Sequence, residues 1–134
     1  MEETGDSELR GAAFHEAGHV TVARFFGLAV GKIEIGEDGS GRAEIAWMDH
    51  LPLIDQIAVC VAGIEAQVLF RCPTNPNVAV SDYAKVIRLV EGLSETESLE
   101  VRNRAYLRAL EILKSRMLEV EDLANDLIKR RRVG

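Results

Sequence analysis

The chain has 134 residues and 22 acidic against 16 basic side chains, which gives a formal net charge of -6 at pH 7. With 47% hydrophobic and 28% charged residues, a sequence of this length suits one compact domain with a single core. The acidic balance argues against nonspecific nucleic-acid binding, because a phosphate-binding surface needs clustered Lys and Arg.

Membrane and secretory segments are not expected. The longest apolar run, residues 57–64, is far shorter than the roughly 20 residues of a membrane span. The acidic N-terminus lacks the basic and then apolar order of a signal peptide, so the sequence predicts a cytoplasmic protein with no membrane partner. Cys60 and Cys72 belong to no Cys-x-x-Cys pair, and we expect both to be reduced packing residues.

The first predicted element is an amphipathic helix that Asp6 or Ser7 can cap and Gly27 can end. Apolar or small residues recur along it at spacings of three and four, namely Leu9, Ala12, Ala13, Ala17, Val20 and Ala23. This pattern indicates that one face of the helix is buried.

The same helix carries His-Glu-Ala-Gly-His at residues 15–19. Residues four apart share a helix face, so the imidazoles of His15 and His19 can reach one metal ion. Glu16 would point beside the ion, where its carboxylate can take a proton from a water molecule. This H-E-x-x-H spacing predicts a zinc peptidase; on a solvated helix face the same residues would be incidental.

After the first helix the pattern becomes extended. Residues 32–35 alternate polar and apolar side chains, residues 36–41 contain three glycines, and residues 42–47 form a second extended segment. This order predicts a β-hairpin. Glu37 and Asp38 would repel phosphate, so we interpret the glycines as turn residues rather than as a phosphate-binding loop.

A second helix is expected over residues 52–69, and it is apolar nearly all round, which predicts a central position. Two prolines and two asparagines in residues 72–80 predict a loop. Ser81 would then cap a third helix that runs to Gly92 and has Asp82 in its first turn.

Ser94 and Glu97 predict a capping box at the start of the C-terminal helical region. Apolar residues then alternate four and three apart, at Leu110, Leu113, Met117, Val120, Ala124 and Leu127. This seam is typical of one long helix or of two helices broken near Ser115, packed within the domain. A coiled-coil dimer is the alternative. The basic residues 129–132 would complement the last helix dipole.

Catalytic zinc usually has three protein ligands, so the histidine pair is incomplete. The candidates for the third ligand are His50, Asp49, Asp55, Glu65 and Asp82. Glu65 fits a plan in which a second helix supplies a glutamate. Asp82 is attractive because a helix N-terminus favours an ionised carboxylate. The long metzincin motif is excluded, since Val22 and Phe25 occupy the positions of its glycine and third histidine.

Three segments resemble the peptidase domain of FtsH-type AAA metalloproteases. Residues 13–20, Ala-Phe-His-Glu-Ala-Gly-His-Val, resemble the helix that opens that domain. Residues 61–68, Val-Ala-Gly-Ile-Glu-Ala-Gln-Val, are similar to its glycine-glycine, alanine-glutamate helix, although Gln67 and Val68 replace a glutamate pair. Residues 80–85, Val-Ser-Asp-Tyr-Ala-Lys, are similar to its serine-asparagine-aspartate segment.

The resemblance implies that His15, His19 and Asp82 hold Zn²⁺, since the aspartate of the last segment is the third ligand in that family. It also implies a single domain over residues 1–134, stand-alone and shortened, without the ATPase and membrane segments. The expected fold is mainly α (α+β), a zincin-like helical domain with a small β-hairpin or sheet and a C-terminal helical hairpin.

The sequence therefore predicts a zinc metalloendopeptidase that hydrolyses peptides or unfolded segments without ATP, with Glu16 as the general base. The resemblance also implies that an extended substrate pairs with an edge strand, which residues 42–48 would supply in this chain. A homo-oligomer and a separate ATPase partner stay open as partners. One alternative is a non-catalytic helical interaction module with a vestigial or structural zinc site. Another is a protease of one specific regulator.

Overall fold

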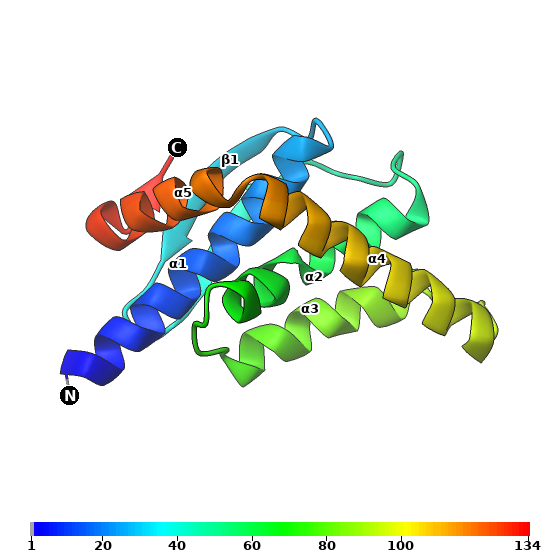
Figure 1. Ribbon diagram of the computed structural model, residues 1–134, viewed down its shortest axis with the longest axis horizontal. Coiled ribbons are helices and arrows are strands. Elements are labelled where there is room, and N and C mark those ends of the chain that lie inside the picture. Colours follow the sequence, from blue (N-terminus) through cyan, green and yellow to red (C-terminus); the bar gives the residue numbers. More distant parts are fainter. Residues whose placement is uncertain (1) are drawn as a thin grey trace.

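The computed structural model describes residues 2–134, and side chains from Asp6 onward (Figure 1). The elements in chain order are α1 (Glu2–Phe25), β1 (Val30–Ile35), β2 (Gly41–Ile45), α2 (Leu53–Leu69), α3 (Pro76–Leu89), α4 (Glu95–Ser115), α5 (Met117–Arg130) and β3 (Arg132–Val133). The expected class, mainly α with a small sheet, is confirmed. No helix in the described part of the chain combines the length and hydropathy that a membrane span requires.

The two apolar helices α1 and α2 pack against each other at the centre of the domain. A Cβ atom on Gly18 would lie 2.5 Å from the Cβ atom of Ala66, so the two helices approach as closely as they do because residue 18 is glycine. The sheet and α5 cover α1, whereas α3 and α4 pack on α2. This arrangement brings the His-Glu-Ala-Gly-His segment directly against α2.

The sheet has three antiparallel strands in the order β2-β1-β3. Ile33 and Ile35 of β1 face the core, as the alternating pattern predicted. β2 has a paired strand on one side only, so it is an edge strand. It covers Gly41–Ile45, whereas the expected edge strand was residues 42–48, and residues 46–48 belong to the loop that follows. The short β3 was not predicted. It forms because Arg131, with φ of 65°, turns the chain after α5 toward β1.

Two predicted helix starts are wrong. α1 continues through Asp6 and Ser7, so neither residue caps it. α3 begins at Pro76 instead of residue 81, because the Asn75 side chain accepts a hydrogen bond from the Asn77 backbone N–H and proline suits the first helical position. Part of the predicted loop is therefore helical, and Ser81 lies inside α3.

The C-terminal region consists of two helices divided at Arg116, and the predicted capping box at α4 is confirmed. The two helices follow one another in space and pack on different partners, α4 on α2 and α5 on α1, instead of forming a hairpin (Figure 1). The predicted seam is largely buried inside the domain, at Leu113, Val120, Ala124 and Leu127. Packing within the domain therefore accounts for these residues.

Cys60 and Cys72 are both buried and unpaired.

Candidate metal centre

α1 buries the polar residues of its central turns against α2. The exposed fractions are 3% for His15, 5% for Glu16 and 9% for His19. The alternative interpretation, in which both histidines lie on a solvated helix face, is therefore wrong. Buried polar groups require partners, so the surroundings of these three side chains decide what the site can do.

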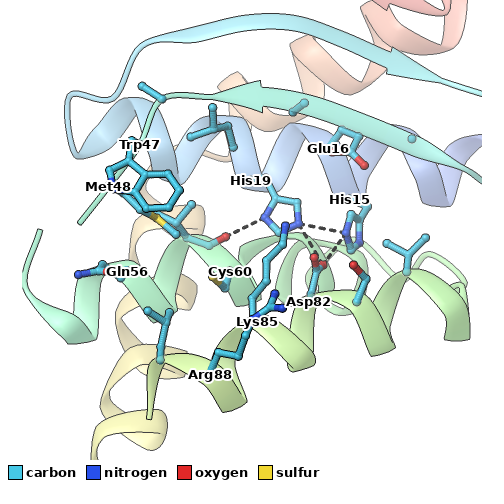
Figure 2. A pocket seen from close by; sticks show the side chains of 18 of the residues that line it. His15, Glu16, His19, Trp47, Met48, Gln56, Cys60, Asp82, Lys85 and Arg88 are labelled. Atoms are coloured by element: carbon cyan, nitrogen blue, oxygen red, sulfur yellow. Dashed lines mark hydrogen bonds and ion pairs between the residues drawn. The ribbon is translucent and has the colours of Figure 1, made fainter. Parts of the chain in front are cut away.

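Both imidazoles point at the Asp82 carboxylate of α3 (Figure 2). Oδ2 of Asp82 lies 2.9 Å from Nε2 of His15 and 3.1 Å from Nε2 of His19. The two Nε2 atoms are 3.0 Å apart. Ligand atoms in tetrahedral zinc sites lie about 2.0–2.1 Å from the ion and hence roughly 3.3 Å from one another. The observed triangle of ligand atoms is slightly smaller, and it would open only a little around an ion.

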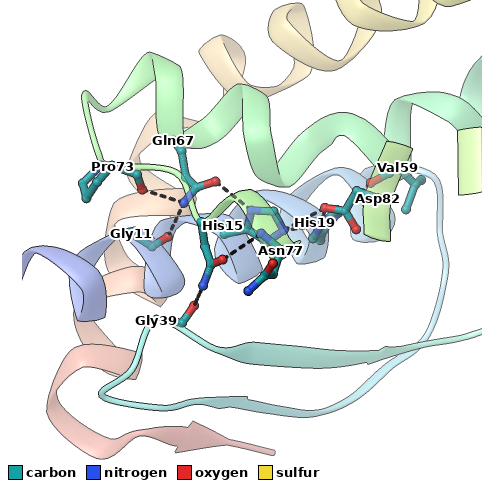
Figure 3. A network of polar contacts seen from close by, with 10 residues as sticks. Gly11, His15, His19, Gly39, Val59, Gln67, Pro73, Asn77 and Asp82 are labelled. Atoms are coloured by element: carbon teal, nitrogen blue, oxygen red, sulfur yellow. Dashed lines mark hydrogen bonds and ion pairs between the residues drawn. The ribbon is translucent and has the colours of Figure 1, made fainter. Parts of the chain in front are cut away.

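Gln67 of α2 fixes the proton position on His15 (Figure 3). Its Nε2 group donates hydrogen bonds to the carbonyl oxygens of Gly11 and Pro73, at 3.1 and 2.9 Å. Carbonyl oxygens only accept, so Oε1 of Gln67 must face Nδ1 of His15, 2.8 Å away. Nδ1 therefore donates, and in the neutral imidazole Nε2 keeps a free lone pair.

His19 is held in the same way by the main chain. Its Nδ1 atom donates to the carbonyl oxygen of Val59 at 2.7 Å. Two imidazole lone pairs and one carboxylate oxygen thus converge, with no donor hydrogen among them when both imidazoles are neutral. A divalent cation resolves the repulsion between three such acceptors. The nitrogen and oxygen donors suit zinc, so the residues fit this ion.

The metal-free site has strongly shifted protonation equilibria. Burial alone would raise the pKa of Asp82, but the hydrogen bonds and charges of His15 and His19 outweigh it and hold the pKa well below its usual range. Asp82 lies in the middle of α3, so the helix N-terminus proposed from the sequence is the wrong reason for its ionisation. Burial lowers the pKa of His19, but its hydrogen bond to Asp82 and the nearby carboxylate charges produce a net rise.

Glu16 lies beside the triangle and is directed toward β2 (Figure 2). A Cβ atom on Gly41 would come within 2.9 Å of Oε2 of Glu16, so glycine lets the strand pass over this carboxylate. Burial raises the pKa of Glu16, and the charges of His19 and His15 only partly offset that rise. A raised pKa suits a group that takes up and releases a proton near neutral pH.

A cavity of about 790 Å³ opens onto these groups between β2 and α3. It is lined by the three members of the triangle, by Glu16, by the edge strand β2 with the loop that follows it, and by residues of α2 and α3. The triangle and Glu16 are therefore reachable from the cavity although they are buried. An extended ligand lying along β2 would pass in front of the triangle.

The other candidates for a third ligand are not brought to the triangle. Within the described residues, His15, His19 and Asp82 alone form a group able to hold one ion. Asp49 lines the cavity outside this group, and Asp55 faces Arg108 at 3.7 Å. His50 and Glu65 are likewise not members of the group.

Gly63 is a residue of this site that the reasoning from motif spacing did not single out. A Cβ atom on Gly63 would lie 2.6 Å from Nε2 of His19 and 2.7 Å from Nε2 of His15. No real Cβ contact is that short, so both imidazoles reach their positions only because residue 63 has no side chain. The match of residues 61–68 to a glycine-containing helix was the only sequence signal for it.

We expect Gly63→Ala to separate the two imidazoles and to weaken zinc binding by at least about 10-fold, because one added methyl group contacts both ligand atoms. Titration of the purified variant against a zinc chelator measures this. Gly31→Ala is the control, since its added methyl group meets the side chain of Glu44 and lies outside the cavity lining. Equal zinc affinity in Gly63→Ala and the unmodified protein would contradict the assigned site.

Zinc binding should be coupled to proton release. The pKa of His19 is raised in the metal-free fold, so His19 stays protonated to a higher pH than an ordinary histidine and must lose that proton before it can bind an ion. We therefore expect zinc affinity to fall as the pH drops through the raised value, by up to about 10-fold per pH unit for one proton. Calorimetry in buffers of different ionisation enthalpy counts the protons released, and an affinity independent of pH would contradict the prediction.

Comparison of the sequence with protein-family models and with curated proteins finds no match.

Proposed function

We propose that this protein is a zinc-dependent metalloendopeptidase. The observation that carries the proposal is the convergence of three acceptor atoms, from His15, His19 and Asp82, beside a buried carboxylate in a cavity bordered by an edge strand. A purely structural zinc site would be closed by four protein ligands, whereas three ligands facing a cavity leave a position open. The resemblance of the same segments to FtsH-type peptidases supports the proposal.

The proposed reaction uses the chain's residues in distinct roles. A zinc ion would supply Lewis acidity, which makes water more acidic and polarises the scissile carbonyl. Glu16 takes the proton from the attacking water and passes it to the leaving amine. Gln67 and the Val59 carbonyl hold His15 and His19 with Nε2 toward the ion, and Asp82 balances part of the ion's charge.

The edge strand suggests the physical form of the substrate. β2 offers unpaired main-chain groups, and an extended peptide can add to such an edge by β-augmentation. Gly41, Ala43 and Ile45 of β2 line the cavity, so a peptide paired there would run past the triangle. Peptides and unfolded segments can adopt this extended form, whereas most main-chain groups of a folded protein are already hydrogen-bonded. The proposed substrates are therefore peptides or unfolded segments.

Digestion of a peptide library with and without a chelator tests the proposal. We expect endoproteolytic cleavage that the chelator removes and that added Zn²⁺ restores. No chelator-sensitive cleavage by zinc-loaded protein would contradict the proposal and favour the non-catalytic module. Cleavage of many unrelated sequences would favour a general peptidase, and cleavage of a single sequence would favour a protease of one regulator.

A further inference from the structure

The cavity is uneven in charge along its length. α3 presents one face to it, with Asn77, Ser81, Lys85 and Arg88 three or four positions apart and Asp82 next to Ser81. Gly41, Asn77 and Val78 add no charge to the cavity lining. Trp47 and Met48 lie on the far side of His19 from His15, and Lys85 and Arg88 of α3 lie below His19 in the same view (Figure 2).

Lys85 and Arg88 are free to bind a ligand. Both are exposed, and neither forms an ion pair with a carboxylate in the described part of the chain. This is notable in a protein with six more acidic than basic side chains, in which Arg42, Arg104 and Arg130 do pair.

The opposing charges at this end are few. Asp49 is the one carboxylate that lines the cavity beside Trp47 and Met48, so Lys85 and Arg88 leave a surplus of one positive charge there. The remaining carboxylates of the cavity lining, Glu16 and Asp82, stand at the triangle, where a divalent ion would balance both. The loaded site would therefore attract a negative group at this end, despite the acidic surface as a whole.

We propose that the peptidase prefers substrates with an acidic side chain on one side of the cleaved bond, the side toward Trp47, where Lys85 and Arg88 bind the carboxylate. This inference rests on the proposed function. Arginine can bind a carboxylate through two parallel hydrogen bonds, and lysine adds a point charge. Because both groups are exposed to solvent, the preference of Glu over Gln should be about five-fold and should decline at high salt.

Two measurements on the zinc-loaded full chain test this. The first compares kcat/KM for library peptides with Glu, Gln or Lys at each position around the cleaved bond. The second measures binding of the same peptides to Glu16→Gln by the fluorescence of Trp47, the only tryptophan, which lines the cavity. Both should show the Glu preference on one side of the bond only. Arg88→Glu should change the preference for Glu peptides into a preference for Lys peptides. Arg88→Gln, which removes the positive charge without adding a negative one, should only reduce the preference for Glu peptides.

Lys129→Glu is the matched control, since it makes the same change of net charge on α5, away from the cavity, and should keep the preference. Cleavage without any difference between Glu and Gln peptides, or a preference unchanged by both Arg88 variants, would overturn the inference while leaving the proposed function intact. If no peptide were cleaved but Glu peptides still bound more tightly than Gln peptides in an Arg88-dependent way, the proposed function would be overturned and the inference about charge preference would stand.

Discussion

Glu16→Gln is expected to abolish chelator-sensitive peptide cleavage while the protein keeps its zinc. Glutamine has nearly the same size as glutamate but cannot accept the proton of the attacking water. General-base catalysis contributes about 10²–10⁴-fold, so kcat should fall by at least that range. Glu16 is not part of the triangle that would hold the ion, so zinc content should not change. Steady-state kinetics and metal analysis of the same sample measure both quantities.

The matched control is Glu65→Gln, the same change on a half-buried carboxylate of α2 outside the cavity lining. It should cleave peptides normally. If Glu16→Gln retained full turnover, the assignment of the base would be wrong.

Glu16→Gln should also stabilise the metal-free protein. Burial raises the pKa of Glu16 in the fold above its ordinary value of 4.5. The favourable contribution of Glu16 to the free energy of unfolding is therefore present below pH 4.5 and is lost as the pH rises through the raised pKa. At neutral pH the buried ionised carboxylate therefore destabilises the fold, and glutamine removes that effect. We expect Tm to rise by a few degrees at pH 7 and to change little at pH 4. An unchanged Tm at both pH values would contradict this account of Glu16.

Asp82→Asn is expected to weaken zinc binding by more than about 100-fold. Loss of a group that only orients a ligand weakens metal binding by up to about 100-fold, and loss of a ligand itself should cost more. Asparagine keeps the shape of the side chain but removes the negative charge that faces both imidazoles at 2.9 and 3.1 Å. Cleavage should be lost at limiting zinc. Chelator competition measures the affinity.

Asp49→Asn makes the same chemical change on another carboxylate of the cavity lining, outside the triangle, and should leave zinc affinity unchanged. Full zinc occupancy in Asp82→Asn under chelator competition would contradict the assignment of Asp82 as the third ligand.

The local patterns predicted most of the fold. Helical spacing identified α1, α2 and the helical C-terminal region, which it left open as one helix or two, and alternation identified the hairpin, because burial of one face leaves a periodic record in the sequence. The start of α3 was misplaced, since the two prolines and two asparagines of residues 72–80 also suit a helix cap followed by proline. The strand β3 has two residues, too few to leave a periodic pattern.

The site was only partly predictable from residue spacing. His15, Glu16 and His19 are close in sequence, so helix geometry alone places them on one turn. Reasoning from the residues left five candidates for the third ligand, and the resemblance to FtsH-type peptidases selected Asp82, which the fold brings to the imidazoles. The roles of Gln67 and Gly63 depend on how closely α2 approaches α1, and that distance is a tertiary property that no local pattern encodes.

The most direct test of the central claim is a crystal structure of the zinc-loaded protein with diffraction recorded on both sides of the zinc absorption edge. The account predicts one strong anomalous peak in the cavity, about 2.0–2.2 Å from Nε2 of His15, Nε2 of His19 and a carboxylate oxygen of Asp82, with an open position toward β2. A loaded crystal with no peak among these three side chains, or with the ion held by other residues, would contradict it.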